Sequence, residues 1–245
     1  MRFRVVTWNI HKGIGGIDRR YQLERVIQLI REVDPDVALL QEVAEGWPPT
    51  RFEVQADELR DALELKHMEF GPEHRYAKGG YGNTILSRWP LSETSHIDLT
   101  VGWRKKRGAL VSRIHLKEGG HSRSVVLCNL HLGLAGSERG IQLERFLKCK
   151  ELSSVRAHTP IIMGGDLNDL WGSLGPRFLV PAGFSRAGNV SNTFPAAVPM
   201  RPLDGVFVRG DLSVEKCRPV RSKLAQAASD HLPLVADLWL PPQRE

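Results

Sequence analysis

The chain has 245 residues, 41% hydrophobic and 25% charged, a composition typical of an ordinary globular protein, and we expect one domain over residues 1–245. Three cysteines without a CxxC pair argue against a structural zinc site or a disulfide framework, and no apolar run approaches the roughly 18 residues that span a bilayer. We therefore expect a cytoplasmic protein without stable membrane association or an obligate protein partner, while the net charge of +6 and the pI near 9.4 favour a polyanionic partner.

The first segments of the chain predict a strand, a helix and a second strand. Residues 3–10 are rich in β-branched and aromatic side chains, as strands are. In residues 21–33 apolar side chains recur at spacings of three and four, which predicts an amphipathic helix. Residues 36–42 form a short apolar run typical of a buried strand. Because polar residues stand where both strands end, we expect Asn9 and Glu42 to meet at one rim of a sheet.

The middle of the chain changes from helical to strand patterns. After a helix expected over residues 55–65, short β-prone segments alternate with Pro, Gly or charged turns, which predicts antiparallel strands. These segments are residues 81–87, 95–99, 108–116 and 125–132. The preceding residues 71–80 are expected to form a loop. A further helix is predicted from Ser137, as its N-cap, to about Arg156.

The last part of the chain places polar side chains at the ends of short apolar strands. Residues 160–169 predict a buried strand that ends at an exposed rim, where Asp166 and Asn168 face the same way. Asp204 begins another strand, and Asp230-His231 leads into the closing one. The order helix, strands, helix, strands predicts a four-layer α/β/β/α sandwich, in which two mixed, largely antiparallel sheets pack face to face with the helices outside.

The candidate site residues share a position beside a short apolar strand. They are Asn9, Glu42, Asn83, His131, Asp166, Asn168, Asp204, Asp230 and His231. Such a set suits metal-assisted hydrolysis of a phosphate ester, because Mg²⁺ prefers oxygen ligands and keeps several waters, so that Glu42 and Asp230 with Asn9 nearby would suffice. A carboxylate beside a histidine raises its basicity and fixes its tautomer, and Asp204 with His231 is a candidate pair of that kind.

Each of these residues also has a structural interpretation. A histidine on an apolar strand, such as His131, is often a core residue, Glu42 can be a surface carboxylate, and Asn83 can belong to a turn after Gly82. One shared active site explains the polar residues at so many strand ends better than a separate structural reason for each. The Cys/His nucleophile, GxSxG, P-loop and HExxH patterns are absent from the sequence.

An ordered set of motifs carries a resemblance to a known family. These are Thr7-Trp8-Asn9-Ile10, Leu40-Gln41-Glu42, Gly82-Asn83-Thr84-Ile85-Leu86-Ser87, Asn129-Leu130-His131, Gly165-Asp166-Leu167-Asn168, Leu203-Asp204 and Ser229-Asp230-His231. Over nearly its whole length the chain resembles the endonuclease/exonuclease/phosphatase superfamily, which implies the deoxyribonuclease I-like sandwich and a Mg²⁺ or Mn²⁺ cofactor.

The resemblance also implies residue roles. Asn9, Glu42 and Asp230 would lie around the metal. Asp166 would activate the water, and Asp204 would orient His231. Asn168 and His231 would stabilise the phosphate in the transition state. His131 would assist the leaving group, as in the deoxyribonuclease-like and sphingomyelinase-like branches. The pattern of the exonuclease III branch is not matched, because an acid shortly after the first Asn, a Tyr-x-Pro-Asn stretch and a Trp before the late Asp are replaced by other residues.

DNA is the expected substrate, because the chain is basic and offers cations as phosphate contacts. Those cations are Lys12, Arg19, Arg20 and Arg107, and Asn83 joins them as a substrate-binding candidate. Trp171, close after Asn168, is expected either to stack on a base or to be a packing residue. Two alternatives stay open: a phosphatase or sphingomyelinase-like enzyme acting on a small or lipid phosphate ester, and a catalytically silent nucleic-acid-binding module.

Overall fold

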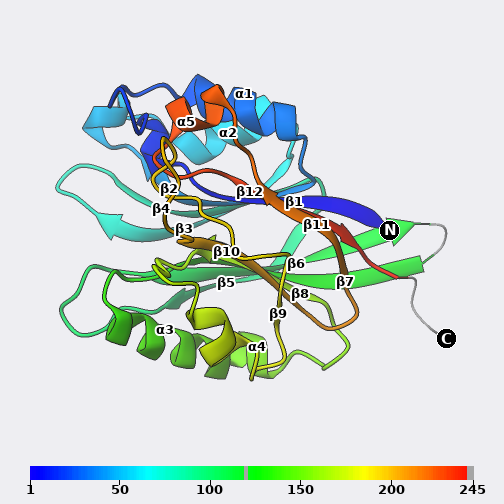
Figure 1. The fold of residues 1–245 in the computed structure, drawn as a ribbon. Helices are drawn as coiled ribbons and strands as arrows, with labels where there is room; N and C mark the ends of the chain where they lie inside the picture. The colour runs from blue at the N-terminus through cyan, green and yellow to red at the C-terminus, as the bar shows by residue number, and fades with distance from the viewer. Residues whose placement is uncertain (119–120, 242–245) are drawn as a thin grey trace.

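Two six-stranded sheets packed face to face form the centre of the protein, and helices cover the outer face of each (Figure 1). The fold is seen in a computed structural model that describes residues 1–118 and 121–241. The four layers confirm the predicted α/β/β/α sandwich. Within the described residues, no helix is long and apolar enough to cross a membrane.

The first sheet has the strand order β11-β12-β1-β2-β4-β3, and only β1 and β2 run parallel. Its strands are β1 (Arg2–Asn9), β2 (Val37–Glu45), β3 (His67–Arg75), β4 (Gly80–Ser87), β11 (Ser213–Pro219) and β12 (Leu234–Trp239). The outer face is covered by α1 (Leu23–Val33), α2 (Gln55–Leu63) and α5 (Lys223–Ala228), with short 3-10 turns η1 (His11–Gly13) and η2 (Pro48–Thr50). Apolar side chains of α1 at spacings of three and four are buried against this sheet, as the periodicity predicts.

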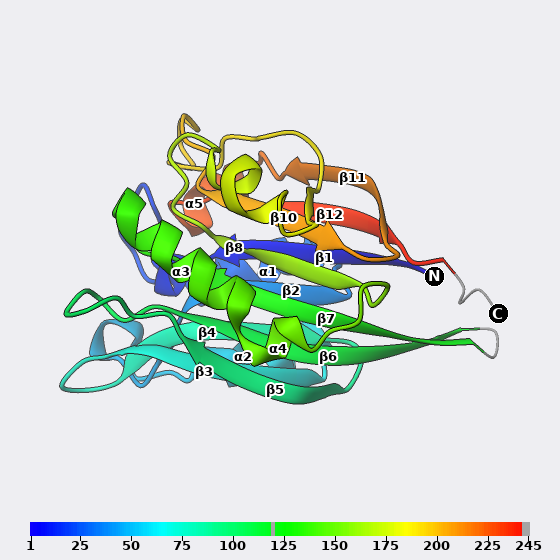
Figure 2. The same ribbon diagram turned by 90° about the horizontal axis from the view of Figure 1, so that it is seen from below.

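The second sheet has the order β5-β6-β7-β8-β10-β9, and only β7 and β8 run parallel. Its strands are β5 (Leu91–Asp98), β6 (Gly108–Glu118), β7 (His121–His131), β8 (Ile161–Asp166), β9 (Ser185–Arg186) and β10 (Asp204–Arg209). Its outer face is covered by α3 (Gly136–Lys148) and α4 (Lys150–Ser153), which lie across the sheet in Figure 2, and by the single π-helical turn η3 (Gly175–Leu179).

The central core lies between the two sheets. Leu39 and Ile85 of the first sheet meet Leu127 and Ile162 of the second, and all four are fully buried. Burying one such side chain contributes about 1.5–3 kcal/mol. These contacts lock the sheets together and hold the strand ends of both in a constant relative position.

Strand direction brings the site residues to one edge of the sandwich. In the second sheet His131 at the end of β7 pairs with Asp166 at the end of β8, and Asp204 at the start of β10 pairs with Asp166 from the other side. In the first sheet Asn9 at the end of β1 pairs with Gln41 of β2. Figure 1 shows β1 running away from the N-terminus, so this edge lies at the end of the molecule far from both chain ends.

Two predictions of local structure are wrong. Residues 71–80 are not wholly a loop, because β3 extends to Arg75. Pro72 lacks an N–H and weakens a strand pattern, but β3 is an edge strand with a register shift between Pro72 and His74, where a proline is tolerated. The helix predicted from Ser137 is two helices, since extended backbone at Cys149 (ψ 155°) interrupts it, and Ala135 rather than Ser137 holds the N-cap position.

Among the strands and α-helices of the described residues, β3, β9, β11 and α5 were not predicted. The sequence of β11 alternates polar and apolar residues only weakly, and α5 is too short to show a helical period. β11 pairs with β12 at the edge of the first sheet, α5 ends at Ala228 just before Ser229-Asp230, and none of the candidate site residues lies on either element.

Candidate active site

Asp166 is the centre of the rim. It ends β8, it is 2% exposed, and its two oxygens face different partners. Oδ1 accepts a hydrogen bond from the backbone N–H of Asn168 at 2.9 Å, and Oδ2 accepts one from Nδ2 of Asn9 at 3.1 Å. Burial raises the pKa of Asp166 to about 6, although the charge of His231 opposes the shift. Asp166 is therefore a carboxylate whose basicity is close to that required of a general base at neutral pH.

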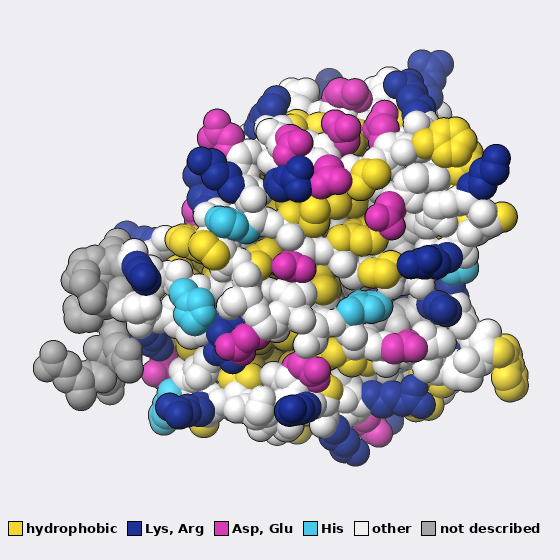
Figure 3. Space-filling view, turned by 180° about the vertical axis from the view of Figure 1, so that it is seen from behind, with side chains coloured by type: hydrophobic (Ala, Val, Ile, Leu, Met, Phe, Trp, Pro, Cys, Tyr) yellow, Lys and Arg dark blue, Asp and Glu magenta, His cyan; other side chains and the backbone are white. Residues whose placement is uncertain are grey.

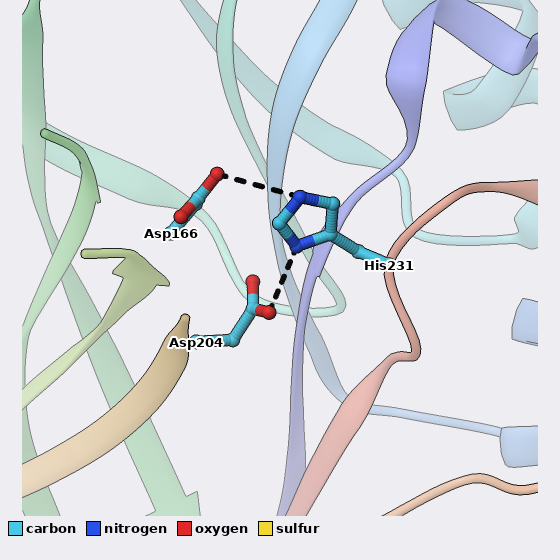
Figure 4. A group of neighbouring side chains, drawn as sticks. All are labelled: Asp166, Asp204 and His231. Carbon is cyan, nitrogen blue, oxygen red and sulfur yellow. Dashed lines mark hydrogen bonds and ion pairs between the residues drawn. The ribbon is translucent and has the colours of Figure 1, made fainter. Parts of the chain in front are cut away.

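His231 stands between Asp166 and Asp204 (Figure 4). Its Nδ1 lies 2.9 Å from Oδ2 of Asp204, and its Nε2 lies 3.7 Å from Oδ2 of Asp166. Burial by itself lowers the pKa of His231, but the charges of Asp204 and Asp166 outweigh it and raise the pKa to about 10. The imidazolium is therefore the stable form at neutral pH, and Nδ1–H donates to Asp204. Thr193 Oγ1 donates to the same oxygen of Asp204, which fixes that carboxylate in turn.

Asn168 is oriented by its own backbone conformation and by a hydrogen bond to the backbone of Leu132. Its φ of 49° lies in the left-handed region, which Asn adopts more readily than most residues. Nδ2 donates to the carbonyl oxygen of Leu132 at 2.8 Å, so the amide orientation is set by the segment that follows β7. The residue is 7% exposed, and its backbone N–H, rather than its side-chain amide, donates to Asp166.

His131, at the end of β7, approaches the same oxygen of Asp166 as His231 does. Its Nε2 lies 3.7 Å from Oδ2 of Asp166, and it is 1% exposed. Burial, reinforced by the positive charge of Arg107, holds the pKa of His131 well below its ordinary value. Asp166 is therefore flanked by one protonated histidine and one neutral histidine, a difference that their environments alone produce.

Glu73 is a site residue that the sequence does not reveal. It lies on β3 and is fully buried beside His131, with its Oε2 3.2 Å from His131 Nδ1. Its Oε1 accepts hydrogen bonds from Asn83 Nδ2 at 2.8 Å and from the backbone N–H of Gly108 at 3.0 Å. Burial raises the pKa of Glu73 to about 8, against the opposing charge of Arg107. The only signal is an acid after Gly71-Pro72, and that dipeptide instead predicts a turn.

Glu42 lies where β2 departs from regular pairing. The register of β2 against β4 shifts between Leu40 and Val43, and Glu42 has a φ of 54°, which turns its side chain toward η1. There its carboxylate forms an ion pair with the ammonium group of Lys12. Burial alone would raise the pKa of Glu42, but Lys12 outweighs this and the pKa lies below its ordinary value. Glu42 is therefore an ionised carboxylate although it is largely buried.

The structure places the three predicted metal ligands around one turn. Asn9 precedes η1, and its Oδ1 accepts a hydrogen bond from the backbone N–H of His11 at 3.0 Å. Asp230 Oδ1 lies 3.7 Å from Nδ1 of the same histidine, and the charge of His11 also acts on Glu42. All three residues offer oxygen donors, which Mg²⁺ and Mn²⁺ prefer. A divalent cation held by Asn9, Glu42 and Asp230 would be neutralised in part by the ionised carboxylate of Glu42.

A second group of potential ligands is more compact. Asp166, Asp204 and His231 offer ligand atoms that all lie within 4.8 Å of one another. Metal binding requires a neutral imidazole, whereas His231 holds its proton up to about pH 10 between the two carboxylates. The charge balance of this group is already met by the imidazolium, so it fits an acid-base triad better than a metal site.

Of the six predicted substrate contacts, Arg19 and Arg20 are exposed, and the other four fall into different environments. Lys12 is bound to Glu42, and Asn83 is fully buried on Glu73. Arg107 is 4% exposed, with its guanidinium 3.9 Å from Glu73. Trp171 is 73% exposed, which excludes the packing alternative. The structure therefore brings Lys12, Asn83 and Arg107 into the wall of the site rather than onto its surface.

Comparison with known proteins agrees with this geometry. The profile of the Endonuclease/Exonuclease/phosphatase family matches residues 6–231. An uncharacterised protein of Escherichia coli K12, YbhP, is 32% identical over 255 residues, which cover 97% of this chain and 96% of that protein. Members of the matched family are phosphoric ester hydrolases that generally depend on a divalent metal.

Solved structures share the fold at low sequence identity. An endonuclease/exonuclease/phosphatase from Beutenbergia cavernae superposes with a TM-score of 0.79 at 24% identity and covers 98% of this chain and 72% of its own. The mannosyl-6-phosphatase Bt3783 of Bacteroides thetaiotaomicron has a TM-score of 0.75 at 17% identity, covering 97% and 100%. D. rerio TDP2, in complex with a single-strand DNA product, has a TM-score of 0.70 at 16% identity, covering 97% and 99%.

Proposed function

Because the chain belongs to the endonuclease/exonuclease/phosphatase family, we propose that it is a Mg²⁺- or Mn²⁺-dependent phosphodiester hydrolase that cleaves DNA. The observation that carries the proposal is Asp166, a buried carboxylate of raised pKa, placed between a protonated and a neutral histidine. Hydrolysis needs a base for the attacking water and a cation or acid for the phosphoryl oxygens, and this arrangement supplies both from one rim.

Glu42, Asn9 and Asp230 are the residues that would hold the metal. When bound, the ion would neutralise charge on the phosphoryl oxygens. Glu42 is ionised, as a ligand must be, and the other two stand on either side of His11. The choice of these residues rests on their oxygen donors and on the family resemblance.

Asp166 and His231 supply the acid-base chemistry of the site. Asp166 accepts a proton from the water, and Asn9 and the Asn168 backbone keep its two oxygens oriented. The imidazolium of His231 stabilises negative charge on the phosphate, while Asp204 preserves its protonation and direction. Asp166 is thereby assigned as the base and His231 as the cationic donor.

The role expected for His131 depends on its neighbour. An imidazole of low pKa does not hold the second proton needed for general acid catalysis at neutral pH. Glu73, which is protonated below about pH 8, lies 3.2 Å from its Nδ1. We assign His131 to the leaving-group side of Asp166 and assign Glu73 and Arg107 to setting its charge.

DNA is proposed as the substrate because the chain carries a net charge of +6 and because one structural relative is described with a single-strand DNA product. A small or lipid phosphate ester is the second candidate, which the mannosyl-6-phosphatase neighbour favours.

We propose a cytoplasmic location for the protein. The three cysteines, Cys128, Cys149 and Cys217, are free thiols, in keeping with a reducing compartment.

A paired assay tests the proposal. Purified protein is incubated with Mg²⁺ or Mn²⁺, and with EDTA as control, on labelled single-stranded, double-stranded and abasic DNA beside phosphomonoesters and phospholipids. Metal-dependent DNA cleavage that is lost in Asp166→Ala supports a nuclease, and the product ladder separates endonuclease from exonuclease action. Intact DNA with hydrolysis of a small or lipid ester would transfer the proposal to the second candidate.

A further inference from the structure

Two tryptophans are exposed on loops at the edge of the second sheet that carries the site. Trp103 lies between β5 and β6 and is 100% exposed, and Trp171 follows β8 and is 73% exposed. Gly108, which begins β6, pairs with His131, and β8 ends at Asp166. Exposing a whole indole to water is costly, because it is among the largest apolar side chains.

The loop of Trp103 reaches across to the first sheet beside the site. Two residues after Trp103, the ammonium of Lys105 lies 5.2 Å from the ring of Tyr81 on β4. Two residues later, Arg107 lies against Glu73. Since two residues of chain span at most about 7 Å, the Trp103 backbone stays within that distance of Lys105. The loop between β5 and β6 that carries Trp103 is therefore continuous with Arg107, which lies against Glu73 beside His131.

The same loop is held to α3 on its other side. Arg104 lies 3.7 Å from Glu138, and Arg145 donates to the backbone oxygen of Thr100 at 2.8 Å. The first contact is an ion pair between side chains and the second holds the backbone at Thr100, so the loop is tied to α3 while the Trp103 indole projects into solvent. A fixed backbone lowers the entropy lost when the indole binds a ligand.

Trp171 is supported in a similar way. Asp169 accepts hydrogen bonds from the backbone N–H groups of Ser173 at 3.0 Å and Leu174 at 2.8 Å. These two bonds close the turn that carries Trp171. The guanidinium of Arg201 lies 4.7 Å from the ring centroid. Trp171 is three residues from Asn168, so its backbone lies within about 11 Å of that residue.

We propose that Trp103 and Trp171 stack on unpaired bases on the two sides of the scissile phosphate, and that the enzyme prefers single-stranded DNA or frayed ends. This inference rests on the proposed function. Stacking needs an open π-face, which a base inside a duplex lacks because its neighbours cover it. Arg201 lies at the Trp171 ring, and Lys105 and Lys106 follow Trp103 on the same loop, so that cations are available for the phosphate attached to every base.

The cation at the Trp171 ring and the basic loop that carries Trp103 favour a nucleic acid over other partners. Figure 3 shows yellow and dark blue side chains next to one another along the right-hand edge, at the end opposite the chain termini. An aromatic ring beside a positive charge suits a ligand that repeats a flat base and an anion. Because every base has a π-face, the contact carries little sequence preference.

The test measures binding and turnover separately. A fluorescent oligothymidylate and a duplex of equal length are titrated in EDTA and followed by anisotropy. The proteins are wild type, Trp103→Ala, Trp103→Phe, Trp171→Ala and the control Trp239→Ala, whose indole is partly exposed on β12. Turnover of bis(p-nitrophenyl) phosphate with Mg²⁺ is measured on the wild type alone and tests the proposed function apart from oligonucleotide binding.

The expected result is single-strand binding about 5- to 150-fold weaker in Trp103→Ala and Trp171→Ala, which is about 1–3 kcal/mol. Trp103→Phe keeps most of the affinity, and Trp239→Ala binds the single strand as wild type does. Wild-type affinity in both alanine variants, or tighter binding of duplex than of single strand, would overturn the inference while DNA cleavage still supports the proposed function.

Two further outcomes are distinct. If wild type hydrolyses neither DNA nor bis(p-nitrophenyl) phosphate, the proposed function fails, whatever the tryptophans do in the binding assay. If the alanine variants lose binding to vesicles of phosphatidylcholine and phosphatidylserine but bind the oligonucleotide as wild type does, the two indoles contact a lipid surface and the stacking inference is wrong.

Discussion

His231 donates from Nδ1 to Oδ2 of Asp204 over 2.9 Å, and this contact decides the charge of the imidazole. A histidine that is 5% exposed would otherwise be neutral, because burial disfavours the charged form. With Asp204 and Asp166 on either side, its pKa is raised to about 10. The site therefore keeps a buried positive charge over the whole physiological range of pH.

Replacing Asp166 by Asn should lower kcat for phosphodiester hydrolysis by about 10²- to 10⁴-fold, the usual contribution of a positioned acid-base group. The substitution keeps the shape of the side chain and removes its basicity. Steady-state kinetics with Mg²⁺ measures the effect, and thermal unfolding by circular dichroism controls for folding. A variant that is folded and turns over at the wild-type rate would remove Asp166 from the mechanism.

The pH profile should be bell-shaped. Activity rises as Asp166 loses its proton near pH 6 and falls as His231 loses its proton near pH 10. In Asp204→Asn the pKa of His231 falls, since the largest source of its upward shift is gone, so the alkaline limb moves to lower pH. Profiles of kcat/KM for both proteins measure the shift. An alkaline limb that does not move would show that His231 is not the group that limits activity.

Glu73 should make the protein less stable as pH rises. Its folded-state pKa, about 8, lies above its ordinary value of 4.5, so the folded state binds the proton more tightly than the unfolded state. The resulting stability is fully present below about pH 4.5 and is lost as pH rises through about 8. Urea unfolding across this range measures the free energy of unfolding at each pH.

Glu73→Gln is the matched variant for this effect. A carboxamide oxygen can still accept from Asn83 and Gly108, but it cannot ionise. The difference in unfolding free energy between wild type and variant should therefore shift in favour of the variant as pH rises from about 4.5 to about 8. A difference that stays constant with pH would contradict the raised pKa.

Oligonucleotide binding should weaken steeply with salt. For single strands log K falls with log salt by about 0.7 for each phosphate that a cation contacts. Lys106 is exposed on the Trp103 loop, so Lys106→Gln should reduce the slope by about that amount. Lys216→Gln on β11 is the control, because its exposed ammonium lies on the strand at the far edge of the first sheet. Equal slopes in all three proteins would place the DNA elsewhere.

Much of the fold could be predicted from local pattern. The period of α1 and the apolar runs of β1, β2 and β8 each depend on neighbours in the chain, which is why their positions agree with the structure. Where local signals conflict, prediction failed. Gly71-Pro72 indicates a turn, yet pairing with β4 draws those residues into an edge strand.

The site residues also differ in whether local sequence pattern could predict them. Asp166 and Asp204 stand at paired strand ends of the second sheet and Asn168 follows Asp166, so strand ends predicted from the sequence bring these groups to one edge. His231 precedes β12 of the first sheet, so its contact with Asp204 also depends on the packing of the two sheets. Glu73 was not accessible to that reasoning, because it reaches His131 only through the pairing of an edge strand.

Charge and exposure were decided by the tertiary structure alone. A neutral His131 beside a protonated His231, an ionised Glu42 bound to Lys12, and a Trp171 open to solvent all follow from which groups surround each side chain. Propensity is a property of neighbours along the chain, whereas burial and pKa depend on neighbours in space. The sequence therefore determined the strands, the helices and the chemical groups at the rim, and the packing of two sheets decided which of those groups carry a proton.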